Sequence, residues 1–376
     1  MSATPPPAPD EAARVSTLEL FFDLVFVFTI TQLTTVLFAD PTGRGLLRVA
    51  LMLGVIWYMY GGYAWLTNAV APDRAGRRLL LLGGMAAFLV LALAIPQAFA
   101  GGGAVFGLAY LAVVAVHAAL FTRAASGGVV RAILRLAPFN LTSALLVLLA
   151  GTLGGAAEYV VWVLALALMW LAGRVASTGS FGGFEIAPAH FVERHGLVVP
   201  IALGESVVAV GTGALRRPVD APLAGVTVLG LLLNACLWWA YFGGDDGRAE
   251  RALDEAARAR CPALALMAFG YWHLPLLLGV IAVASALREA TGHAFGPRRG
   301  AGVRVGWWSL SFPVRGGALP SLTGDRAGVV ARRDGRAGPR DDPAGDRRRG
   351  RGANRRASRA AGCGLRGRVR GNHKGA

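Results

Sequence analysis

Nine apolar stretches of about 17–24 residues recur along most of the chain, and they constrain its fold more than any other feature. Each is long enough to cross a hydrocarbon core of about 30 Å as a helix. Runs this uniformly apolar favour helices, because backbone groups in lipid must be satisfied within the segment. We therefore predict an all-α, polytopic transmembrane helical bundle. The expected spans are residues 18–38, 46–66, 79–99, 103–122, 134–153, 157–176, 196–214, 222–242 and 264–287.

The overall charge of +16 is unevenly distributed along the sequence. Residues 1–296 carry 18 Arg against 17 acidic residues, whereas residues 297–376 carry 20 basic residues against 5 acidic ones. The body is thus close to neutral, so nucleic acid is not expected as its partner and the lipid bilayer is. Three cysteines without ligand spacing predict neither a disulfide scaffold nor a zinc site, and we expect no metal or cofactor.

Arg residues in the short loops predict the orientation of the chain in the membrane. With the N-terminus inside, the inner segments up to residue 260 carry 13 Arg and the outer loops carry 4. The Pro-rich residues 1–16 are then a disordered cytoplasmic lead, and the acidic residues in and before the first apolar run argue against a cleavable signal peptide. We expect a multi-pass protein of the inner or plasma membrane.

The Arg- and Gly-rich tail, residues 291–376, conflicts with this topology, because nine spans place its positive charge outside. One interpretation is a disordered basic arm that binds anionic lipid or nucleic acid. The other, which we favour, is an out-of-frame translation that begins near residues 290–300 of a GC-rich gene. The transmembrane domain would then be residues 17–290.

Two carboxylates stand out in the first span, where Glu19 and Asp23 share a helix face. An ionisable group inside a membrane span suggests a functional site and needs an internal partner or a water-filled path. The plainer interpretation is that Glu19 lies at the interface and that both acids complement the positive N-terminal end of the helix dipole.

A third carboxylate, Glu205, falls close to the middle of the seventh span, with Ser206 beside it on a small and polar face. Such a face lets another helix approach closely. We predict an ion or proton pathway formed by Asp23, Glu205, Glu19 and Ser206; a protonated Glu205 with a packing role is the alternative.

Four further polar residues, His190, Glu193, Arg194 and His195, precede that span and are expected at its inner mouth. Their string resembles a zinc-protease motif only superficially, because two histidines five residues apart diverge on a helix. A solvated loop cluster is the plainer interpretation, and a proton relay toward Glu205 is the sharper one. The aromatic stretch at residues 57–65 is expected to form an interfacial belt.

Two long motifs, TLELFFDLVFVFTITQLTTVL and AHFVERHGLVVPIALGESVVAVG, resemble the bacterial low temperature requirement A family. The stretches WYMYGGYAWLTN and YWHLPLL are similar to its intermediate parts, and the resemblance covers roughly residues 16–290. It implies a polytopic inner-membrane protein of undefined activity with about twelve spans, three more than are found here. The family-pattern residues are Glu19, Asp23, His190, Glu193, Arg194, His195, Glu205 and Ser206.

A fainter similarity links FFDLVFVFTITQL to the first pore helix of the potassium channel family that carries an FSD signature. We therefore expect a channel or transporter for a cation or small solute, coupled to protons, and not an enzyme; a homo-oligomer is compatible with the sequence. One alternative is a membrane-embedded enzyme on a lipid substrate, with Glu193, His195 and Glu205 converging as acid and base. The other is a non-catalytic structural protein.

Overall fold

The computed structural model describes residues 15–69, 74–123, 127–177, 186–215, 217–257 and 260–292. Nearly all of the predicted N-terminal lead and of the basic tail lies outside these residues. The described part is helical and contains no strand. Nine of its helical segments are long and apolar enough to cross a membrane, which confirms the predicted fold class and span count.

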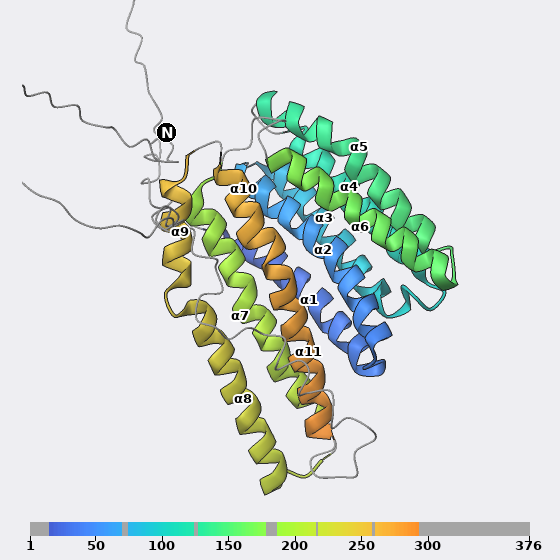
Figure 1. Cartoon of the computed structure of the whole chain (residues 1–376), viewed down its shortest axis with the longest axis vertical. Helices are drawn as coiled ribbons and strands as arrows, with labels where there is room; N and C mark the ends of the chain where they lie inside the picture. Colours follow the sequence, from blue (N-terminus) through green and yellow to red (C-terminus); the bar gives the residue numbers. More distant parts are fainter. Residues whose placement is uncertain are drawn as a thin grey trace, which may run out of the picture.

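The chain runs up and down through long helices that lie roughly side by side (Figure 1). The first six are α1 (Thr17–Ala39), α2 (Gly43–Ala69), α3 (Ala75–Ala94), α4 (Gly103–Phe121), α5 (Gly127–Ala150) and α6 (Gly155–Ser177). A short 3-10 turn, η1 (Ile95–Gln97), ends the third span. The second half holds α7 (Pro188–Gly213), α8 (Ala221–Phe242), the short α9 (Asp245–Glu255), α10 (Cys261–Ala265), the π-helical η2 (Leu266–Tyr271) and α11 (His273–Gly292).

The helices form two groups that meet at α1 and α2. Helices α3 to α6 lie on one side and α7, α8 and α11 on the other, with α8 at the periphery (Figure 1). Helix α1 packs against α2, α3, α7 and α11, and α2 packs against α4, α6 and α7. The first and second spans are thus central, and polar residues on α1 can meet partners on both α2 and α7.

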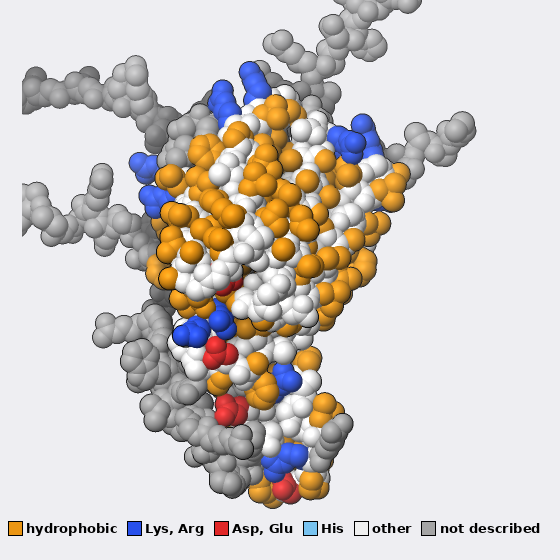
Figure 2. Space-filling view, turned by 90° about the vertical axis from the view of Figure 1, so that its right-hand side faces the viewer, with side chains coloured by type: hydrophobic (Ala, Val, Ile, Leu, Met, Phe, Trp, Pro, Cys, Tyr) orange, Lys and Arg blue, Asp and Glu red, His pale blue; other side chains and the backbone are white. Residues whose placement is uncertain are grey.

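The outer face of the bundle is mostly hydrophobic. Figure 2 shows a broad area of hydrophobic side chains with Lys and Arg along its upper margin. Helix α8 is the extreme case, since Leu229, Leu231, Leu232 and Trp239 on it are all more than half exposed. Such a surface is unfavourable in water and is the expected exterior of a protein surrounded by lipid tails.

Glycines allow α4 and α5 to pack closely. A Cβ atom added to Gly107 would lie 2.4 Å from Leu148 Cα, and one added to Gly103 would lie 2.5 Å from Gly151 Cα. Close backbone approach at small residues is a common way to pack helices in a membrane, where lipid tails are as apolar as the core.

The structure corrects two expectations. Helix α7 begins at Pro188 and not near residue 196, so His190, Glu193, Arg194 and His195 lie inside a membrane-length helix rather than in a loop before it. The aromatic stretch at residues 57–65 does not form an outward-facing belt, because the side chains of Trp57, Tyr60 and Tyr63 are buried in the bundle.

Candidate functional site

The candidate site lies where the N-terminal turns of α1 and α7 meet the C-terminal turns of α2. Helix α1 is capped by Ser16, whose Oγ accepts a hydrogen bond from the Glu19 backbone N–H at 3.3 Å. The Glu19 carboxylate in turn accepts from the Ser16 backbone N–H at 2.9 Å, which completes a capping box. The cap fixes the start of the helix and holds the Glu19 side chain against the bundle.

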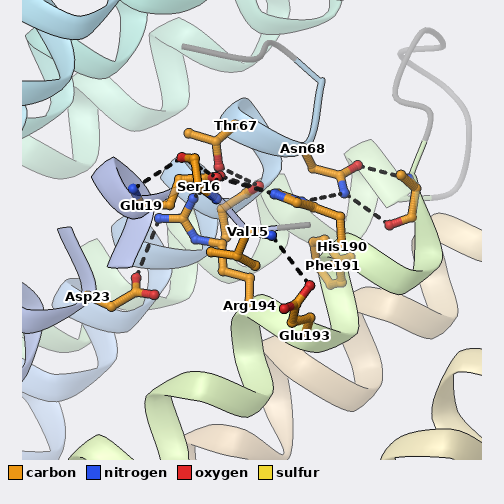
Figure 3. Close-up of polar contacts among 12 residues, drawn as sticks. Val15, Ser16, Glu19, Asp23, Thr67, Asn68, His190, Phe191, Glu193 and Arg194 are labelled. Atoms are coloured by element: carbon orange, nitrogen blue, oxygen red, sulfur yellow. Dashed lines mark hydrogen bonds and ion pairs between the residues drawn. The ribbon is translucent and has the colours of Figure 1, made fainter. Parts of the chain in front are cut away.

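Arg194 joins the two acids of the first span from the facing helix. Its Nη1 donates to Glu19 Oε1 at 2.7 Å and also to Thr67 Oγ1 on α2, and its Nη2 lies 3.5 Å from Asp23 Oδ1. Figure 3 shows the guanidinium between the two carboxylates. Arg194 and Asp23 are fully buried, and Glu19 is 2% exposed. The two acids therefore pair with an arginine that sequence reasoning had grouped with the other mouth residues.

His190 contacts the far side of the same carboxylate. Its Nε2 lies 3.2 Å from Glu19 Oε1, and its Nδ1 lies 3.2 Å from Asn68 Nδ2. The amide of Asn68 is oriented by Ala187, whose backbone N–H donates to Oδ1 and whose carbonyl accepts from Nδ2. The amide therefore donates to Nδ1, and this geometry assigns His190 as the tautomer with its proton on Nε2, directed at Glu19.

This tautomer leaves the cluster with one more negative than positive charge when both carboxylates are ionised. Arg194 balances either Glu19 or Asp23, and the neutral His190 balances neither. A buried uncompensated charge is costly, so one proton or one cation is needed to neutralise the group. The arrangement is thus suited to holding an exchangeable positive charge.

Asp23 is the residue best placed to take that charge. Its Oδ1 accepts a hydrogen bond from the Tyr60 hydroxyl at 2.9 Å, whereas its Oδ2 has no hydrogen-bond partner among the described residues. The same holds for Arg194 Nε. The guanidinium also lies over the rings of Phe22 and Tyr60, at 5.6 and 5.8 Å from their centroids. Buried networks that serve only stability are normally fully satisfied.

Glu205 forms a second polar contact between the same two helices. Its carboxylate accepts a hydrogen bond from the Thr31 hydroxyl of α1 at 2.5 Å. Eleven residues separate Arg194 from Glu205, so both lie on one face of α7, about 16 Å apart along the axis. The buried Val198 and Ala202 lie between them on that face.

The predicted pathway residues are thus divided into two sets. Glu19 and Asp23 belong to the Arg194 cluster, and Glu205 stands apart from it with Thr31. Ser206 is buried, and its hydroxyl has no hydrogen-bond partner among the described residues. Beyond Glu205, Arg288 of α11 donates to Thr35 at 3.4 Å.

The predicted mouth residues also separate. Glu193 points away from Arg194, and its carboxylate accepts from the Val15 backbone N–H at 3.4 Å (Figure 3). His195 lies in an aromatic environment, with ring centroids of Phe191 at 4.3 Å and Phe269 at 5.1 Å. Within the described ranges no three His, Cys, Asp or Glu side chains gather to hold a metal ion.

Sequence reasoning did not identify three partners of these charges, namely Tyr60, Thr67 and Thr31. Tyr60 lies in the aromatic stretch of α2 and Thr67 lies just after it. The two are seven residues apart, a spacing that places them on one helix face. Thr31 lies about two turns beyond Asp23 on α1. Hydroxyl groups at such spacings in an apolar run are the signal that could have identified them.

A helical bundle with a lipid-compatible exterior and a buried charge cluster between two spans defines a polytopic membrane protein. The sequence profile of the bacterial low temperature requirement A protein (LtrA) matches residues 14–314. The chain therefore belongs to the LtrA family. It is also 28% identical over 326 residues to an uncharacterized protein of Rhizobium meliloti (strain 1021). The aligned region covers 84% of this chain and 76% of that protein. No solved structure matches.

Proposed function

We propose that this protein moves a cation or small solute across the membrane, coupled to protons, along the interface of α1 and α7. The observation that carries the proposal is the buried cluster in which two carboxylates, Glu19 and Asp23, share one guanidinium, that of Arg194, and one carboxylate oxygen has no hydrogen-bond partner among the described residues. Ionisable groups inside membrane spans are expensive and commonly mark ion or proton pathways. The acceptor for the moving charge is Asp23 Oδ2.

A gated pathway is supported by two groups of polar side chains at different depths along α1 and α7. Asp23 and Arg194 form the Asp23 level, Thr31 and Glu205 form the Glu205 level, and an apolar layer separates the two. Asp23 and Thr31 lie eight residues apart on α1, about 12 Å along the axis. Phe26 on α1 and Val198 and Ala202 on α7 are fully buried between the levels. Layers of this kind block water and ions when they are closely packed. In the proposed cycle, a small movement of α7 against α1 opens this layer and connects the Asp23 level with the Glu205 level.

The arrangement favours transport over the enzymatic alternative. Glu193, His195 and Glu205 would have to converge on one substrate, but His195 and Glu205 lie ten residues apart on one helix, about 15 Å along its axis. His195 is also enclosed by aromatic rings, and Glu193 turns toward Val15. A general acid and base must both come within hydrogen-bond reach of the reacting group.

The test is ion flux in liposomes that contain the purified protein. An inward pH gradient is imposed, and its dissipation is followed with a trapped pH-sensitive dye in the presence of K⁺, Na⁺ or neither. We expect wild type to dissipate the gradient faster than empty liposomes, and Asp23→Asn and Glu205→Gln each to reduce the rate at least tenfold.

Glu158→Gln is the matched control, because Glu158 is a buried carboxylate in the first turn of α6, outside this interface. We expect it to retain the wild-type rate. Flux in Asp23→Asn and Glu205→Gln equal to that of wild type for every cation would refute the pathway.

A further inference from the structure

An aromatic-lined cavity of about 120 Å³ lies on the opposite side of α2 from the charge cluster. Its walls come from α2, α4, α5, α6, α7 and the segment of α10 and η2. Tyr58, Trp170 and Tyr271 provide ring surfaces, and the rings of Trp170 and Tyr271 stack at 4.5 Å. Small-molecule sites are typically concave and apolar in this way, with a few polar groups that orient the ligand.

Glycines on two helices keep this space open. A Cβ atom added to Gly61 on α2 would meet no atom within 4 Å, and one added to Gly173 on α6 would meet Tyr58 and Leu266 at 3.6 and 3.8 Å. Both glycines line the cavity. The space therefore exists because side chains are missing there, and methyl groups would enter it without displacing the backbone.

Polar side chains also contribute to the wall, among them Trp170, Asn140, His117 and His195. The Trp170 indole N–H is buried and has no acceptor among the described residues. Asn140 accepts a hydrogen bond from the Tyr58 hydroxyl at 3.0 Å and so fixes the orientation of that phenol. A buried indole donor without a partner is costly, and a ligand that carries an oxygen acceptor would satisfy it.

The wall from η2 is π-helical, a geometry that often marks functional sites. The π-turn changes the backbone hydrogen bonding, and side chains contact backbone carbonyl oxygens there. Trp57 Nε1 donates to Gly270 O at 2.9 Å, and His273 Nδ1 lies 3.0 Å from Ala268 O. These contacts hold Gly270 and Tyr271 in the wall in a defined position.

We propose that this cavity binds a small, neutral aromatic molecule with an oxygen acceptor, of the size of a phenol. Its volume is close to that of an engineered cavity of about 150 Å³ that binds benzene. The aromatic walls stack on the ring of the ligand, and the Trp170 N–H donates to its oxygen. No carboxylate is found among the described residues that line the cavity, so the site is suited to a neutral ligand rather than an organic cation.

The test uses 4-fluorophenol as the probe and the full-length protein in lipid nanodiscs, with binding followed by ¹⁹F NMR against empty nanodiscs. We expect saturable binding in the micromolar to millimolar range, as about eight non-hydrogen atoms allow. The analogue 4-fluorotoluene lacks the oxygen and should bind about fivefold more weakly. Equal binding of the two probes would contradict the hydrogen bond to Trp170.

A second experiment measures binding of the same probe to variants in which added side chains fill the cavity. The double variant Gly61→Ala/Gly173→Ala, and separately Gly61→Leu, should weaken binding of 4-fluorophenol at least tenfold. Gly83→Ala is the matched control, because a methyl group there also meets no atom within 4 Å but Gly83 lies on α3, outside the cavity. Binding that survives both cavity-filling variants, or that is lost equally in Gly83→Ala, would overturn the proposal.

Discussion

Replacing Arg194 with Met should destabilise the protein strongly, because it removes the cation and leaves two carboxylates in the bundle. The guanidinium is fully buried, and its partners Glu19 and Asp23 are at most 2% exposed, at 2.7 and 3.5 Å. Breaking a buried pair by deleting one member costs about 3–5 kcal/mol, mostly from the charge left behind. The free energy of unfolding can be measured by titrating SDS into detergent micelles and following tryptophan fluorescence.

Removing a carboxylate as well should recover part of this loss. We expect the double variant Arg194→Met/Glu19→Gln to be more stable than Arg194→Met by about 1–2 kcal/mol, since neighbouring charges couple by this amount. The matched control is Arg48→Met, because Arg48 is partly exposed, lies 3.7 Å from Asp40 and donates to the Tyr159 hydroxyl at 2.8 Å, so its removal leaves no buried charge and should cost less than the removal of Arg194. If Arg194→Met unfolds at the wild-type SDS concentration, or if the second change adds a further loss, the assignment of a buried ion pair is wrong.

Three smaller effects follow from individual contacts, all measurable by the same unfolding titration. Tyr60→Phe removes the hydrogen bond to Asp23 and should lower the free energy of unfolding by about 1.5–3 kcal/mol. A loss of no more than about 0.5 kcal/mol, which is typical of a surface substitution, would contradict that contact. Ser16→Ala removes the cap of α1 and should cost about 1 kcal/mol, whereas Ser16→Asp should retain most of the stability. Gly107→Ala places a methyl group 2.4 Å from Leu148 Cα and should cost about 1–3 kcal/mol, so an unchanged midpoint would show that α4 and α5 are not this close.

The spans were predictable from the sequence because their signal is local. Length and uniform apolarity are read from consecutive residues, and nine spans were both expected and found in the described part of the chain. The exception is the start of α7, where Arg194 and two histidines made the first turns look like a loop. The burial of Arg194 depends on its pairing with Glu19 and Asp23, more than 170 residues away, and no local pattern contains that pairing.

The composition of the site was only half predictable for the same reason. Glu19, Asp23 and Glu205 stand out because carboxylates are rare in apolar runs. Their division into two levels depends on which partner each one meets across the helix interface. Tyr60 was assigned to an interfacial belt because the sequence shows only that it is aromatic, and not that its hydroxyl lies 2.9 Å from Asp23.

The most direct test of the proposed proton-coupled pathway is the electrical response of reconstituted protein to a pH jump on a solid-supported membrane. We expect a transient current in wild type that disappears in Asp23→Asn, because the amide cannot take up a proton in place of the Oδ2 carboxylate oxygen, and that persists in Glu158→Gln. A wild-type protein that gives no current with a proton, K⁺ or Na⁺ gradient, or an undiminished current in Asp23→Asn, would contradict it.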